Sequence, residues 1–152
     1  MILADEKYSF SKVPEEHYYE FYSKGPKGVI KKVVRYSLIQ EHPYKVFNLG
    51  FGDWDKERQD VDDQINTNND DRQKVLATVA ETVVDFLVVY PHAVIFAEGS
   101  TASRTRLYQM NILAYWKEIK QSSYIVQGYV NGSWQTFEKG INFEAFIIRR
   151  NH

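Results

Sequence analysis

Hydrophobic and polar residues alternate along the first third of the chain in the manner of β-strands. Residues 18–23 are crowded with aromatic side chains, and residues 29–40 place their apolar side chains on one face. A Gly-Pro-Lys-Gly turn at residues 25–28 separates these two runs, and a third run follows Pro43 at residues 44–51. Because the connections are short, we predict three strands that pair as antiparallel neighbours in a meander.

The hydrophobic period changes to that of a helix after residue 70. Asp70 and Gln73 fit a capping box, and Pro91 is expected to end the helix. Residues 93–97 predict a short buried strand, and Gly99 then opens a second predicted helix over about residues 101–120. The positions that predict the first helix are Val75, Leu76, Val79, Val83, Phe86, Leu87 and Tyr90.

The last third of the chain returns to extended runs, at residues 124–130, 133–139 and 142–150. Asn131-Gly132 between the first two is a strong hairpin signal. The order β-β-β, α, β, α, β-β-β predicts an α+β fold, with a largely antiparallel sheet and two main helices packed on one face. Neither a repeat nor a linker divides the chain, so we predict a single α+β domain over residues 1–152.

One acidic stretch stands out from this regular pattern. Residues 55–69 are rich in Asp and Asn and are predicted to form a surface loop. The wider segment 53–71 has eight acidic residues against two basic ones, a net charge of −6, while the whole chain carries −1. The remaining +5 suits an anionic ligand but is small for a nucleic-acid-binding protein. We therefore do not predict nucleic acid as a partner.

Composition excludes several classes of site. The chain has no cysteine, which excludes disulfides, thiol nucleophiles and Cys-ligated metals. Its four histidines are scattered without metal-binding spacing, so we predict neither a metal nor a cofactor. The longest apolar run, residues 86–90, is far shorter than the ~20 residues of a membrane span, and the N-terminus does not resemble a signal peptide. We expect a cytoplasmic protein with no membrane contact, and a homo-oligomer remains open.

Hydroxyl and guanidinium groups gather where the 93–97 strand leads into the second predicted helix. A helix N-terminus offers unpaired N–H groups and a partial positive charge, which favour phosphate or carboxylate. Arg104 would supply charge, Ser100 and Thr101 would donate hydrogen bonds, and Glu98 or Tyr108 is the acid/base candidate if the protein is an enzyme. The predicted ligand-binding residues are Gly99, Ser100, Thr101, Ser103, Arg104, Arg106 and Tyr108.

Helical spacing also places Arg104, Tyr108, Asn111 and Tyr115 on one face, where they could line a cleft. Two arginines at a helix start oppose the helix dipole, so another group must favour them. An anionic ligand is one explanation. The alternative is that a Ser or Thr caps the helix while the arginines pair with Glu98 or with the acidic stretch. The segment lacks both the P-loop pattern and the dinucleotide fingerprint.

Two further segments are candidate sites. In residues 50–55, Asp53 could act as a base and Trp54 as a stacking wall; the alternative is a strand end with a bulge. Basic residues interleave with tyrosines in residues 18–36, as in proteins that bind single-stranded nucleic acid. Strand alternation should place Lys31 and Lys32 on opposite faces, however, which favours a solvated strand face.

Residues 96–108, F-A-E-G-S-T-A-S-R-T-R-L-Y, and the flanking elements resemble a family of short uncharacterised bacterial proteins catalogued as a domain of unknown function. The resemblance runs nearly full length and implies a stand-alone domain, but no activity. Our leading hypothesis is a small-ligand module, enzyme or not, that binds an anionic or phosphate-bearing group at the second helix. The alternative is a protein-interaction module, such as one partner of a bacterial two-protein regulatory or defence system, using its aromatic sheet or acidic stretch.

Overall fold

The structure is a computed structural model that describes residues 6–62 and 67–152. Before the first long helix come five strands and a 3-10 turn: β1 (Ser11–Val13), η1 (Pro14–Glu16), β2 (Tyr18–Gly25), β3 (Gly28–Gln40), β4 (Val46–Asp55) and β5 (Asp60–Asp62). The later elements are α1 (Arg72–Val89), β6 (Val94–Ala97), α2 (Ala102–Ala114), α3 (Trp116–Lys120), β7 (Tyr124–Val130), β8 (Ser133–Thr136) and β9 (Ala145–Arg150). The predicted α+β class and element order are confirmed, with β1 and β5 as additions.

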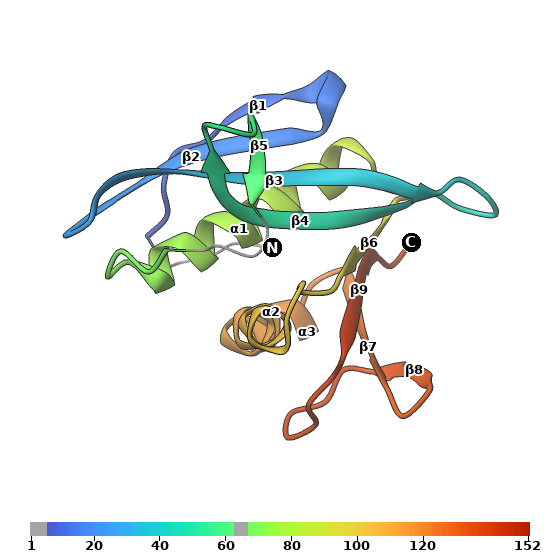
Figure 1. The fold of residues 1–152 in the computed structure, drawn as a ribbon. Helices are drawn as coiled ribbons and strands as arrows, with labels where there is room; N and C mark the ends of the chain where they lie inside the picture. The colour runs from blue at the N-terminus through green and yellow to red at the C-terminus, as the bar shows by residue number, and fades with distance from the viewer. Residues whose placement is uncertain (1–5, 63–66) are drawn as a thin grey trace.

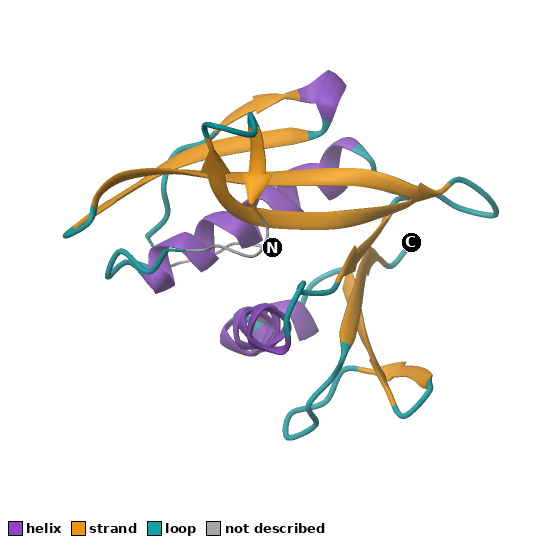
Figure 2. Ribbon diagram, viewed as in Figure 1, coloured by secondary structure: helices purple, strands orange, loops and turns teal. Residues whose placement is uncertain are grey.

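The strands form one mixed sheet in the order β1-β2-β3-β4-β6-β9-β7-β8, with β5 paired to β4. The β4–β6 pair is parallel, and the other described pairs are antiparallel. Figure 1 shows that β6, β9 and β7 run at a steep angle to β3 and β4. The α-helices lie on the inner side of this bend, as the colours of Figure 2 make clear.

The sheet forks at strand β4, because the edge of β4 that faces away from β3 pairs with two different strands. Residues 46–48 pair with β6, and residues 53–55 pair with β5. In the described part of the chain, residues 49–52 have a strand partner only on the β3 side. The backbone at this fork needs other hydrogen-bonding partners, since unpaired buried backbone groups are costly.

A single cluster of buried aromatic and aliphatic side chains joins the two halves of the bent sheet to the helices. Phe86 of α1 stacks on Tyr36 of β3 with ring centres 4.3 Å apart, and it also meets Phe47 of β4 edge-on. Phe146 of β9 and Phe137, which follows β8, complete the cluster on the other side. Aromatic pairs of this kind add ~0.5–1.5 kcal/mol each beyond the area they bury.

Two local predictions are wrong or incomplete. The capping box does not form, because Asp71 rather than Asp70 is the N-cap of α1 and makes no side-chain capping bond. Its carboxylate instead accepts hydrogen bonds from the hydroxyls of Tyr8 and Ser23, at 2.6 and 2.5 Å. The predicted helix over residues 101–120 is two helices, α2 and α3, which meet at Tyr115. Tyr115 leaves helical geometry at a position without Gly or Pro, so the break has no sequence signal.

The predicted surface loop at residues 55–69 is also only partly correct. Residues 60–62 form β5, residues 63–66 lie outside the described part, and Asn69 is buried with 1% exposure. The Asn69 amide donates to the Ser23 hydroxyl and the Gly28 carbonyl and accepts from the Lys27 N–H. Asn69 therefore holds the turn between β2 and β3 in place through these side-chain hydrogen bonds.

Candidate functional site

The start of α2 is capped by its own hydroxyl groups. Thr101 Oγ1 accepts a hydrogen bond from the Arg104 N–H at 3.2 Å. Thr105 Oγ1 accepts from the Gly99 N–H at 3.0 Å and donates to the Thr101 carbonyl at 3.2 Å. Gly99 must be glycine here, because a Cβ atom would lie 2.3 Å from the Thr105 nitrogen. The expectation that a Ser or Thr caps this helix is therefore confirmed.

Arg104 points inward from the first turn of α2 and is only 6% exposed. One amino group, Nη2, donates to the Phe51 carbonyl in the forked region of β4, and the guanidinium lies 5.5 Å from the Phe51 ring centre. The other amino group, Nη1, is buried without a partner. Within residues 6–62 and 67–152, Arg104 has no carboxylate partner. At the fork of the sheet, this arginine therefore contacts the Phe51 carbonyl and ring.

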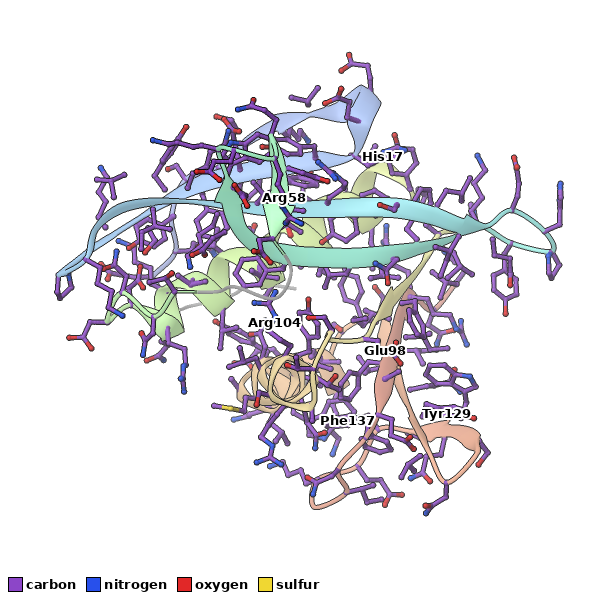
Figure 3. All side chains as sticks on the ribbon, viewed as in Figure 1. His17, Arg58, Glu98, Arg104, Tyr129 and Phe137 are labelled. Atoms are coloured by element: carbon purple, nitrogen blue, oxygen red, sulfur yellow. The ribbon has the colours of Figure 1, made fainter. Side chains whose placement is uncertain are left out.

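Five of the other residues predicted for this site do not share the buried position of Arg104. Ser100, Thr101, Ser103 and Arg106 are exposed, and so is Glu98 at the end of β6. Figure 3 shows Arg104 between α2 and β4, with Glu98 well to its side near β6 and β9. Two residues along a helix turn the side chain by about 200°, so Arg104 and Arg106 point in opposite directions. A single bound group therefore does not contact both arginines.

The predicted helical face does line a cavity, although Arg104 is not among its lining residues. Tyr108, Asn111 and Tyr115 border a cavity of about 70 Å³ between the helices and the sheet. The other lining residues are aliphatic except for Tyr124. Tyr108, the second acid/base candidate, is thus buried beside an apolar space, on the same face of α2 as Arg104.

Asp53, the base candidate in residues 50–55, has a structural partner. Its Oδ1 lies 2.5 Å from the ammonium nitrogen of Lys32, which is fully buried, and its Oδ2 accepts from the Thr67 N–H at 3.1 Å. The predicted strand end with a bulge is wrong at this point, since β4 continues to Asp55. The register shift lies in the partner strand, between Leu38 and Gln40.

The basic residues of β3 alternate as predicted. Lys32 is buried, whereas Lys31 lies on the other face, 3.0 Å from a Glu20 carboxylate oxygen and 4.4 Å from the ring centre of Trp54. Trp54 therefore contacts a lysine and, edge-on, Tyr18. Arg35 lies 5.8 Å from the Tyr18 ring centre, so a short row of two cations and two aromatic rings does cross this face, but both cations are paired with carboxylates, those of Glu20 and Asp60.

The described residues provide neither a cluster of metal ligands nor a membrane-spanning helix. Among the residues that the structure describes, no group of three or more His, Asp or Glu side chains could hold a metal ion. His17 packs edge-on against Phe86 and Tyr90, and His92 lies against His152 with ring centres 4.5 Å apart. None of the described helices has the length and apolar character needed to span a membrane.

Sequence reasoning missed two polar groups that the structure leaves without partners. Asn111 Oδ1 and Arg150 Nε are both buried and unpaired. Asn111 was placed on the correct face of α2 by its spacing, but its hydrogen bonds depend on α1. Arg150 was predicted only as a strand residue, and its neighbours come from β7. Strand parity alone would have placed Arg150 on the same face as Ile148.

These features define an α+β domain with a forked mixed sheet and a buried arginine at the start of its second helix. The chain belongs to a family of unknown function (DUF6934), whose family model matches residues 4–151. The resemblance to a domain of unknown function is thereby confirmed. No curated protein and no solved structure matches the chain.

Proposed function

We propose that this protein is a small-ligand-binding module that receives an anionic or phosphate-bearing group at Arg104. The observation that carries the proposal is the Nη1 group of Arg104, which is buried and has no hydrogen-bond partner. Glu98 and Tyr108 have no chemical role in this binding. Ser100 and Ser103 are exposed at the N-terminal end of α2, whereas the guanidinium of Arg104 is buried.

The charge of Arg104 is only partly compensated by its surroundings. A guanidinium stays protonated in proteins, and burying an ion without a counter-charge costs several kcal/mol. The Phe51 carbonyl offsets part of this cost with one hydrogen bond. An anion at Nη1 would offset more, because charge-assisted hydrogen bonds are about twice as strong as neutral ones. The positive end of the α2 dipole would add to the attraction.

The test is anion-dependent stabilisation in matched variants. Arg104→Met removes the charge and keeps an unbranched apolar stem, whereas Arg104→Ala would also open a cavity. Arg106→Met is the control, because it removes the same charge from an exposed position two residues away. The readout is the thermal midpoint in phosphate-free buffer, with and without about 10 mM inorganic phosphate at constant ionic strength.

We expect phosphate to raise the midpoint of the unmodified chain and of Arg106→Met by about 3–5 °C if Kd is about 1 mM. Arg104→Met should show no shift. A shift that persists in Arg104→Met, or no shift in the unmodified chain, would contradict the proposal. A shift lost equally in both variants would indicate a general charge effect instead.

A protein-interaction role is the second candidate, and exposed apolar side chains favour it. Leu38, Ile39 and Tyr44 are 46%, 57% and 53% exposed at the free end of the β3–β4 hairpin. Tyr44 and Val89 line a groove of about 360 Å³ beside the C-terminal end of α1. Sedimentation velocity of the chain and of Ile39→Lys tests self-association through this end. If the unmodified chain sediments as a monomer at all concentrations, a second copy of the chain is excluded as the partner.

A further inference from the structure

The apolar cavity beneath α2 lies where all the layers of the fold meet. Its lining side chains come from β4, α1, β6, α2, α3, β7 and β9. Leu49, Val79 and Val126 are almost fully buried on its inner wall. Ala80, Val83 and Tyr124 are half-buried, so the cavity opens between α1 and β7. This position is independent of Arg104, which does not line the cavity.

Asn111, one of the lining residues, carries an unpaired acceptor. Its Nδ2 group donates to the Leu76 carbonyl of α1 at 3.0 Å, which fixes the orientation of the amide. Turning the amide over would bring Oδ1 against that carbonyl, so Oδ1 must be the atom that faces away from it. Oδ1 is buried and has no partner. A buried acceptor left unpaired is destabilising, and a hydrogen bond from a ligand donor would offset that cost.

Arg150 presents an unpaired donor on the same side of the sheet. In the β7–β9 pair, Tyr124 stands opposite Arg150 and Val126 opposite Ile148. Tyr124, Val126 and Ile148 line the cavity, and alternate residues of a strand share a face, so Arg150 projects toward the cavity side. Its Nε is buried without a partner. Among the described residues, Arg150 forms no salt bridge with a carboxylate.

Charges of both signs lie close to the mouth of the cavity. Burial raises the pKa of Tyr124, while the nearby Arg150 lowers it and the nearby Glu81 raises it. Arg150 stands opposite Tyr124 in the β7–β9 pair, and Glu81 follows the lining residue Ala80 on α1. The Glu81 carboxylate is 3.3 Å from the ammonium of Lys7. A ligand with one positive and one negative group would suit this mouth better than a simple anion.

The size of the cavity limits the apolar part of the ligand. A cavity of about 150 Å³ holds benzene, which corresponds to roughly 25 Å³ for each carbon. A volume of about 70 Å³ therefore fits about three carbons, the size of an isopropyl group. The aliphatic lining offers such a group good contacts, and water would find few polar partners there.

We infer that this cavity binds a small branched aliphatic amino acid of valine size. The side chain fills the apolar space, the ammonium group donates to Asn111 Oδ1, and the carboxylate accepts from Arg150. The inference goes beyond the anion site at Arg104 and does not depend on it.

The experiment is calorimetric titration of the full chain with L-valine, and with isovalerate as a ligand that lacks the amino group. Asn111→Leu removes the acceptor, and Arg150→Gln removes the charge. Arg149→Gln is the matched control, since Arg149 stands opposite Ile125 on the other face of the sheet. Ala80→Leu fills the cavity from its half-buried rim and should not lower stability. Thermal midpoints establish that each variant is folded.

We expect L-valine to bind the unmodified chain and Arg149→Gln equally. Binding should weaken at least tenfold in Asn111→Leu and Arg150→Gln and for isovalerate, and it should disappear in Ala80→Leu. Absence of L-valine binding at about 10 mM, unchanged binding in Ala80→Leu, or equal affinity for isovalerate would each overturn the inference. Arg104→Met should bind L-valine normally, so failure here and failure of the phosphate site are separate results.

Discussion

The buried ion pair between Lys32 and Asp53 allows a prediction whose size follows from the structure. Lys32 is completely buried, and its ammonium nitrogen lies 2.5 Å from Asp53 Oδ1 and 2.9 Å from the Thr67 carbonyl. Asp53→Ala leaves this charge without its carboxylate and removes the acceptor of the Thr67 N–H. Loss of one partner of a buried pair costs about 3–5 kcal/mol. That is a large part of the roughly 5–15 kcal/mol that stabilises a typical domain.

Replacing both residues should cost much less than replacing one. In Lys32→Met/Asp53→Leu no buried charge remains, and the loss is expected to be about 1–2 kcal/mol, chiefly from the unpaired Thr67 N–H. Arg58→Ala is the control: the Arg58 side chain is 58% exposed, so its ion pairs should contribute at most about 0.5 kcal/mol. Urea unfolding with linear extrapolation measures all three. The reasoning fails if Asp53→Ala costs under about 1 kcal/mol, or if the double variant costs as much as the single one.

Three other predictions test the packing and the charges of the fold. Gly128→Ala should lower the free energy of unfolding in urea by about 1–3 kcal/mol, because the new Cβ would lie 2.3 Å from the Phe143 ring. Gly50→Ala is the control and should be neutral, because no atom lies nearer than 3.7 Å to its Cβ position. Asn69→Ala should cost a similar ~1–3 kcal/mol by removing the amide that fixes the β2–β3 turn, and a loss below about 0.5 kcal/mol would refute that role. The Arg35 guanidinium lowers the pKa of Asp60, so the stabilisation of β5 is present above the unfolded pKa of about 3.9 and is lost as pH falls through the lowered value. Cross-strand NMR contacts of β5 should disappear at a higher pH in Arg35→Gln; an unchanged midpoint would contradict this.

Elements with a strong hydrophobic period could be predicted from the sequence, and those fixed by distant contacts could not. The helix ending before Pro91 and the Asn131-Gly132 hairpin were predicted because their signals are local. The short strand β5 has no such period, since its three residues are held by pairing with β4. The break at Tyr115 depends on how two helical segments pack on the core. Such contacts are set by tertiary structure, which overrides local propensity.

The candidate site shows the same division. Spacing placed Arg104, Tyr108, Asn111 and Tyr115 on one face of α2, and the structure confirms that this face points inward. The sequence did not show that Arg104 would contact the Phe51 carbonyl, because the gap in the pairing of β4 exists only once β5 and β6 have both formed. The exposed serines and Arg106 fitted an anion-site pattern by residue type alone.

The forked strand β4 also bears on the order in which the chain assembles. Strands β2, β3 and β4 are joined by tight connections, so each hairpin closes a small loop and can zip up early. The parallel junction brings Val46 to Val94 and Ile95 to Phe47 across a much longer separation, and it is secured by three residue pairs. We therefore expect this seam to close after the β2–β3–β4 meander during refolding.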